Sequence, residues 1–278
     1  MQKKDFNFYG LEELNQKEAV NGIINCYISE EVHFKMICAN NDCAISRRFY
    51  WNNCYEKKTL DLWSLLSKLI SNKIIIDIGA HAGVYSLCAT ITNNTNQVLS
   101  FEPFFMNYAR MSTNFKINNL NPNNLYMLAV GDMNKQSTLK LNTNIHYLSS
   151  GGSILGKGNY EIPIQEISID SFIKDIDKPK VGLIKIDVEG YEANVMDGLQ
   201  GLLKLSEPVI FFECNEESVA EYFNLEISKN YYFYEINDKE LSIKKVDKLE
   251  ATREYFLHNR VAIPKKNNKI VKLLNSLI

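Results

Sequence analysis

The segment KIIIDIGAHAGVYSL, residues 73–87, is the feature that most constrains the fold. An apolar run leads to Asp77, and Gly79 and Gly83 then stand four positions apart before an amphipathic helical pattern begins. This strand–turn–helix pattern is typical of nucleotide-binding α/β sheets. The dinucleotide fingerprint G-x-G-x-x-G would place a glycine where this chain has His81. His81 and the preceding carboxylate disfavour a diphosphate, so the turn suits an amine or a sulfonium group better.

Alternating strand and helix patterns follow this turn. Amphipathic helix patterns separate further apolar strand patterns, which occur at 96–103, 125–130, 181–187 and 208–214. The alternation predicts an α/β fold with a parallel sheet and helical crossovers. Two late segments, 231–236 and 255–264, predict antiparallel strands. The polar stretch 131–160 predicts a hairpin and a mobile loop.

The first 57 residues carry a different pattern and predict an N-terminal elaboration on the substrate side. HFKMICAN (33–40) and AISRRFYW (44–51) are two apolar segments separated by turn-forming residues, so we expect them to form a hairpin. A helix is expected next, with Leu60, Trp63, Leu66 and Ile70 on one face. The predicted division is therefore 1–57 for the elaboration and 58–278 for the main α/β domain.

Charge and composition exclude some classes of partner and location. The chain has 31 basic and 33 acidic residues, so it lacks the basic footprint of a nucleic-acid-binding protein. No apolar run is long enough for a membrane-spanning helix, and the first residues do not resemble a signal peptide. We therefore expect a cytoplasmic protein with no integral membrane segment. The six cysteines form no CxxC pair, and Cys88 and Cys214 are predicted to be buried thiols. The oligomeric state stays open.

Four of five predicted strand ends are acidic. Ligands in α/β sheets bind at the carboxyl ends of the strands, where this chain has Asp77, Glu102, Ala129, Asp187 and Glu213. Glu102 follows Asp77 by 25 positions, a spacing that suits a carboxylate accepting hydrogen bonds from a ribose diol. An adenosine ribose without a diphosphate predicts S-adenosylmethionine as the cofactor.

A second acidic pair follows the 181–187 strand. Asp187 and Glu189 are separated by one residue and could position a hydroxyl, act as a general base or hold a divalent metal. The alternative is that one of them caps the following helix.

Several motifs together resemble the FkbM family of S-adenosylmethionine-dependent methyltransferases. They cover residues 73 to about 215 and read IIIDIGAHAGVYS, SFEPF, LAVGD, VGLIKIDVEGYEANVMDGL and IFFECN. The resemblance implies a Rossmann-like class I methyltransferase fold, with a mostly parallel seven-stranded sheet flanked by helices. It also implies O-methylation of a carbohydrate hydroxyl, in a glycan, glycolipid, polysaccharide precursor or nucleotide-sugar. His81 departs from the asparagine usual in the family, although both side chains can hydrogen-bond near the methionine moiety.

The resemblance also assigns cofactor-binding positions. It implies that Asp77, Gly79, His81 and Gly83 lie at the methionine end and that Glu102 and Pro103 lie at the ribose. Ala129 and Val130 would flank the adenine, and Phe104 could pack on it or belong to the core.

The expected catalytic residues are Asp187, Glu213, Lys185 and Glu189. Asp187 is the leading general base or orienting group, because the acceptor hydroxyl must lose its proton as the methyl group arrives. Glu213 would complete the site, and Lys185 would pair with Asp187 or touch the acceptor. A divalent metal held by Asp187, Glu189 and Glu213 is an alternative way to acidify the hydroxyl.

Three other bases and two other functions stay open. His81, His146 and His258 are weaker candidates for the base. An NAD-dependent oxidoreductase is one rival function, which His81 in place of glycine opposes. A non-catalytic scaffold that binds S-adenosylmethionine or a glycan is another, which the acidic strand ends oppose.

Overall fold

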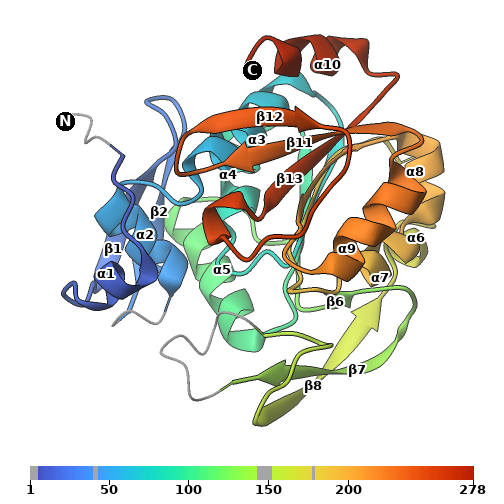
Figure 1. Cartoon of the computed structure of the whole chain (residues 1–278). Coiled ribbons are helices and arrows are strands. Elements are labelled where there is room, and N and C mark those ends of the chain that lie inside the picture. The colour runs from blue at the N-terminus through green and yellow to red at the C-terminus, as the bar shows by residue number, and fades with distance from the viewer. Residues whose placement is uncertain (1–5, 40–42, 143–151, 177–178) are drawn as a thin grey trace.

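A central eight-stranded sheet organises the molecule in this computed structural model, which describes residues 6–39, 43–142, 152–176 and 179–278 (Figure 1). The strands of this sheet are, in chain order, β3 (Ile74–Ile78), β4 (Gln97–Phe101), β5 (Leu125–Tyr126), β9 (Val181–Ile186), β10 (Val209–Glu213), β11 (Tyr231–Asn237), β12 (Ser242–Val246) and β13 (Asn259–Pro264). Their spatial order is β12-β11-β13-β10-β9-β3-β4-β5.

Four of the pairings between neighbouring strands are parallel and three are antiparallel. The parallel pairs join β10, β9, β3, β4 and β5, whereas β13, β11 and β12 add antiparallel pairs at one side. This arrangement confirms the predicted α/β fold with a mostly parallel sheet and the predicted antiparallel late strands. The sheet has one strand more than the predicted seven, because β12 forms a hairpin with β11 at the edge.

Helices cover both faces of the sheet, and alternating side chains along each strand explain why. In β3, Ile75 packs into one hydrophobic cluster while Ile74, Ile76 and Ile78 pack into another. The first cluster lies under α3 (Lys57–Leu69), α4 (Val84–Thr92), α5 (Phe105–Ile117) and α10 (Asn268–Asn275). The second lies under α6 (Ile169–Phe172), α7 (Glu192–Asp197), α8 (Gln200–Ser206), α9 (Glu217–Tyr222) and the π-helix η1 (Phe223–Ile227).

The N-terminal region differs from the predicted hairpin. Its elements are α1 (Leu11–Asn15), β1 (Gly22–Tyr27), β2 (His33–Cys38) and α2 (Ala44–Asn52). The predicted partner of 33–40 is the helix α2, and β2 pairs instead with the preceding strand β1. Buried Ser46 and Phe49 stand three apart in α2, a helical spacing that the apolar content of the segment had masked.

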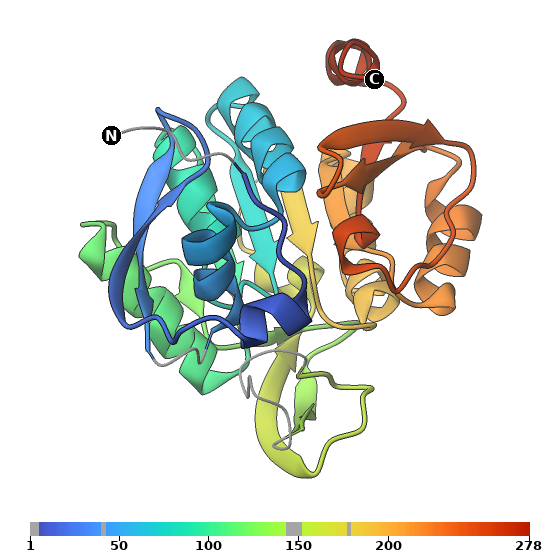
Figure 2. The ribbon, with the colours of Figure 1, turned by 60° about the vertical axis from the view of Figure 1, so that its left-hand side comes forward.

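This region packs on the main sheet rather than standing apart. Phe34 of β2 and Trp63 of α3 belong to the same hydrophobic cluster as the sheet residue Ile75. Figure 2 shows the N-terminal elements lying along the side of the molecule formed by α3, α4 and α5.

The predicted strand 125–130 is divided between two sheets. Its first part is β5, and its second part is β6 (Ala129–Val130), which pairs in parallel with β8 (Tyr160–Ile167). The strand β8 also pairs antiparallel with β7 (Lys135–Leu141), and this small sheet projects from one end of the molecule (Figures 1 and 2). The antiparallel pair predicted for 131–160 is thus present, but its second strand lies at Tyr160–Ile167, almost wholly beyond that stretch. The loop segment with His146 lies outside the described residues.

Candidate active site

A cavity of about 330 Å³ opens at the carboxyl ends of the parallel strands. Four strands each bring a residue to its wall. Gly79 follows β3, Glu102 follows β4, Asp187 follows β9 and Glu213 ends β10. The cavity therefore lies at the edge where ligands bind in α/β sheets.

The cavity brings together nine of the twelve predicted site residues. These are Gly79, His81, Glu102, Pro103, Ala129, Val130, Asp187, Glu189 and Glu213. The other three, Asp77, Gly83 and Lys185, do not line it. These three residues lie behind the cavity wall and support the residues that form it.

Gly79 lets two strand ends approach each other. Its φ is +77°, and a Cβ at this position would stand 1.7 Å from the carbonyl oxygen of Asp187. Any side chain here would therefore push Asp187 away from the turn. Gly83 has a φ of +84° and precedes α4, where a Cβ would stand 2.8 Å from the Cγ of Met111.

Asp77 has its partner inside the fold. The Ser86 hydroxyl of α4 donates to its carboxylate at 2.6 Å, and only 1% of the residue is exposed. Burial raises the pKa of Asp77 to about 6, against the lowering effects of the Ser86 hydrogen bond and of Lys185. Asp77 thus ties β3 to α4 beneath the glycine turn.

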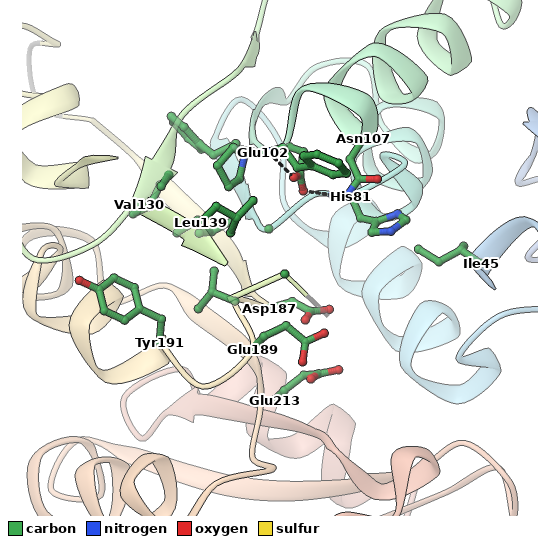
Figure 3. A pocket seen from close by; sticks show the side chains of 18 of the residues that line it. Ile45, His81, Glu102, Asn107, Val130, Leu139, Asp187, Glu189, Tyr191 and Glu213 are labelled. Carbon is green, nitrogen blue, oxygen red and sulfur yellow. Dashed lines mark hydrogen bonds between the residues drawn. The ribbon is translucent and has the colours of Figure 1, made fainter. Parts of the chain in front are cut away.

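Glu102 holds the backbone on both sides of one end of the cavity. Its Oε2 accepts from the His81 amide and its Oε1 from the Phe104 amide, both at 2.8 Å (Figure 3). Burial raises the pKa of Glu102, while His81 and these hydrogen bonds work in the opposite direction. The Asn107 side chain also hydrogen-bonds to Glu102, so of the about four hydrogen bonds that a carboxylate can accept, about one remains for a hydroxyl donor from a ligand.

His81 lines the cavity with unused hydrogen-bonding capacity. Its φ is +49°, a left-handed conformation that places the side chain on the turn. Both ring nitrogens are buried, and neither has a hydrogen bond to a nitrogen or oxygen atom among the described residues. Although burial lowers the pKa of the ring, the neighbouring Cys43 thiol raises it above its usual value. A ligand with polar groups at this point would satisfy the ring nitrogens, and the amino-acid portion of S-adenosylmethionine has such groups.

Lys185 and Asp187 form an ion pair, as the sequence predicted. The Lys185 ammonium lies 3.2 Å from Asp187 Oδ2, and the lysine is fully buried. Burial lowers the pKa of Lys185, but the carboxylates of Asp187, Glu56 and Glu213 more than offset this and raise it. Lys185 is therefore an ammonium at neutral pH and fixes Asp187 from behind.

Three carboxylates gather at the other end of the cavity. Figure 3 shows the side chains of Asp187, Glu189 and Glu213 pointing to the same side. Burial and, to a smaller extent, the Asp187 charge together raise the pKa of Glu189 to about 7. The same two causes raise the pKa of Glu213 well above its usual value. This end of the cavity is well suited to accept a proton.

Within the described residues, no group of three or more His, Cys, Asp or Glu side chains is arranged to hold a metal ion. The alternative of a divalent metal on Asp187, Glu189 and Glu213 therefore receives no support from their geometry.

The turn before the next helix is held by a residue other than the two that were predicted to cap it. Glu192 accepts from the amides of Val188 at 3.2 Å and Gly190 at 3.4 Å, so it organises the turn instead of Asp187 or Glu189.

Sequence reasoning missed most of the cavity's outer wall. Arg48 and Ile45 of α2 line it, together with Tyr55 and Glu56 before α3 and Tyr255 near β13. Ile45 and Arg48 are three residues apart, so they share a face of the chain if the segment is a helix. A strand assignment hides this relation. His258, a weaker candidate for the base, also lines the cavity.

Two further observations concern the cysteines and the helices of the described part of the chain. All six cysteines are free and buried, which confirms the prediction for Cys88 and Cys214. Among the described residues, no helix has both the length and the apolar character needed to cross a bilayer.

Comparisons with known proteins agree on a broad class. The model of the methyltransferase FkbM domain matches residues 77–257. A hexuronic acid methyltransferase of Haloferax volcanii, AglP, is 25% identical over 147 residues, which are 50% of this chain and 55% of the relative. The chain thus spans about half the length of this curated relative.

Two solved structures are similar at low identity. A methyltransferase FkbM from Methylobacillus flagellatus is 16% identical with a TM-score of 0.42, covering 72% of this chain and 47% of that one. A SAM-dependent methyltransferase from Agrobacterium tumefaciens is 11% identical with a TM-score of 0.41, covering 74% of this chain and 58% of that one.

Proposed function

Because the chain belongs to the methyltransferase FkbM domain family, we propose that it transfers a methyl group from S-adenosylmethionine to a sugar hydroxyl in a glycan, glycolipid or nucleotide-sugar. One observation carries the proposal. A single cavity has a ribose-type carboxylate, Glu102, at one end and a cluster of proton-accepting carboxylates around Asp187 at the other. The methyl donor and the acceptor hydroxyl could therefore bind at opposite ends of the same cavity.

The cofactor would occupy the end formed by the glycine turn and Glu102. The remaining acceptor capacity of Glu102 suits a ribose hydroxyl, and the buried nitrogens of the His81 ring suit the methionine portion. The apolar residues Ala129, Val130 and Leu139 line the adjoining wall, where a purine would lose contact with water.

The acceptor would lie against the carboxylates. S-adenosylmethionine supplies a methyl group already activated on a sulfonium, so the protein must position the hydroxyl and remove its proton. Asp187 is the proposed base. The hydroxyl oxygen forms the new bond to the methyl carbon, the carbon–sulfur bond breaks, and the hydroxyl proton passes to Asp187. Lys185 holds Asp187 in place at 3.2 Å.

Ligand binding tests the proposal first. S-adenosylhomocysteine should raise the melting temperature of the protein, and NADH should not. No shift with S-adenosylhomocysteine would rule out the proposed cofactor, and a shift with NADH alone would favour the oxidoreductase.

Methyl transfer is the second test. With labelled S-adenosylmethionine and a panel of sugars, label should move to a sugar hydroxyl and survive treatment with EDTA. Label on nitrogen or on a carboxylate would contradict O-methylation of a hydroxyl. Loss of transfer with EDTA, restored by a divalent cation, would show that a metal is required.

A further inference from the structure

The charge of the cavity also indicates the class of sugar. Resting on the proposed function, we infer that the acceptor is an uncharged sugar ring with at least two adjacent hydroxyls, and that the site discriminates against hexuronates. The inference depends on the four carboxylates that line the acceptor end and on the few hydrogen-bond donors that they have.

Four acidic side chains contribute to this wall. Asp187, Glu189 and Glu213 come from the strand ends, and Glu56 comes from the segment before α3. They are close enough to affect one another. The charges of Asp187, Glu189 and Glu56 all raise the pKa of Glu213, with burial as the largest cause.

The cations near this wall are fewer. Lys185 does not line the cavity, and its ammonium is paired with Asp187. Arg48 does line it, with its guanidinium 4.3 Å from the centre of the Tyr255 ring. His258 is held toward its neutral form, because burial lowers its pKa. Carboxylates therefore outnumber the cations that reach the cavity.

Glu213 is poorly supplied with hydrogen-bond donors. The residue is only 8% exposed, yet the hydrogen bond that its side chain accepts among the described residues is a long contact of 3.4 Å from the Asn215 side-chain amide. His258 Nε2 is buried without a hydrogen-bond partner among the described residues. Buried polar groups of this kind are costly unless a ligand satisfies them.

A sugar hydroxyl can meet both needs, because it donates one hydrogen bond and accepts others. Adjacent hydroxyls can donate to neighbouring carboxylates while they accept from Arg48. The carboxylate of a hexuronate has no hydrogen to donate to Asp187 or Glu213. It would also bring a negative charge beside carboxylates that already repel one another, since burial and the Asp187 charge both raise the pKa of Glu189 and of Glu213. Like-charge juxtaposition of this kind is a recognised source of specificity.

Matched pairs of acceptors test the inference. Methyl glycosides of glucose, galactose and mannose would be compared with the corresponding uronides, which differ only at C6. For the stereochemistry that is methylated best, we expect kcat/KM to favour the neutral sugar by about tenfold or more. A preference for the uronide of that pair would overturn the inference and leave O-methylation of sugars standing.

Variants identify the cause of the preference. Glu56→Gln keeps an acceptor for the Tyr85 hydroxyl, which contacts Glu56, and removes one negative charge. It should narrow the preference several-fold. Glu31→Gln, at an exposed side chain outside this cavity, is the matched control and should leave the ratio unchanged. An unchanged ratio in Glu56→Gln would show that the acidic wall does not set the preference.

Two further outcomes separate this inference from the function on which it rests. If the uronide is preferred and Arg48→Met abolishes that preference, Arg48 outweighs the acids and the inference is wrong. If S-adenosylhomocysteine binds but no sugar of either kind is methylated, both the acceptor class and this inference fail. If S-adenosylhomocysteine does not bind, the proposed function fails first.

Discussion

At the scale of single residues, Glu102 carries the proposed recognition of the ribose. Glu102→Ala should weaken binding of S-adenosylhomocysteine by about 1.5–3 kcal/mol, roughly 10- to 100-fold, because it removes hydrogen bonds to a charged group. Isothermal titration calorimetry measures the change. Glu221→Ala, an exposed glutamate of α9, is the control. Unchanged affinity in a folded Glu102→Ala variant would place the ribose elsewhere.

Asp187 should affect turnover more than cofactor binding. Asp187→Asn keeps an oxygen for Lys185 but removes the proposed base, so kcat should fall by about 10²- to 10⁴-fold. Affinity for S-adenosylhomocysteine should change less than about threefold. Asp247→Asn, at an exposed position, should leave both quantities unchanged. Full activity in Asp187→Asn would move the role of base to Glu189, Glu213 or His258.

The sequence predicts which strand-end residues lie near the site, because ligands bind at the carboxyl ends of parallel strands and most of these ends are acidic. It does not predict which of these residues line the cavity and which lie behind it. Asp77 and Glu102 were both predicted to bind the cofactor. The Asp77 side chain points inward to Ser86, whereas Glu102 lines the cavity. A one-residue difference in where a strand ends reverses the direction of a side chain, and sequence patterns place strand ends less finely than that.

At the scale of elements, α3 begins on a carboxylate from a distant part of the chain. Asp238 Oδ1 accepts from the Thr59 amide at 2.8 Å, and Oδ2 accepts from the Thr59 hydroxyl at 2.8 Å. Burial and, to a smaller extent, the Glu56 charge together raise the pKa of Asp238 to about 7. The contribution of Asp238 to the free energy of unfolding therefore depends on pH.

The sign of the coupling follows from the two states. An unfolded aspartate has a pKa of about 3.9, so between about pH 4 and the folded value of about 7 the folded chain holds a proton that the unfolded chain has lost. The contribution of Asp238 to the free energy of unfolding therefore falls as the pH rises through this window.

Asp238→Asn should remove this dependence. Relative to the parent, the variant should gain about 1–3 kcal/mol of stability between about pH 4.5 and about pH 8. Chemical denaturation at several pH values measures the difference, with Asp247→Asn as the exposed control. A stability difference that is flat with pH would contradict the raised pKa.

Secondary structure was predictable where periodicity was unambiguous. The buried strands β3, β9 and β10 and the helix α3 follow directly from their patterns. The region before residue 57 was not, because short apolar segments suit a strand and a helix equally well. The burial of Phe49 and Ser46 against the rest of the fold decides for α2, and that contact is invisible in the local sequence.

At the scale of the whole molecule, one hydrophobic cluster joins the N-terminal region to the sheet. Phe34 of β2 is 2% exposed and packs edge-on against Phe49, with ring centres 5.7 Å apart. Phe34→Ala should therefore cost about 3–5 kcal/mol of global stability. Tyr27→Ala, at a 42% exposed position of the same hairpin, should cost far less.

Unfolding should also be a single transition. Trp51 lies in α2 and Trp63 in α3, so fluorescence reports on both regions while far-ultraviolet circular dichroism reports on the whole fold. The two denaturation curves should coincide for the parent and for Phe34→Ala. Separate midpoints would show that the N-terminal region unfolds independently.

The architecture at this scale was the most predictable, because alternating strands and helices leave few topologies. The cavity's outer wall was the least predictable. It combines α2, the segment before α3 and the residues before β13, which lie far apart in the chain and meet only after the sheet forms.

The burial of all six cysteines has a practical consequence. Thiol reagents react with exposed thiolates, so the folded chain should resist modification and each sulfur should report when its own surroundings open. Cys43 would be the most responsive. Although burial raises its pKa, His81 and Arg110 lower the net value to about 7. The rate at which a thiol reagent modifies Cys43, followed by peptide mass spectrometry, would report how often the His81 turn opens. A ligand that keeps this turn closed should lower that rate.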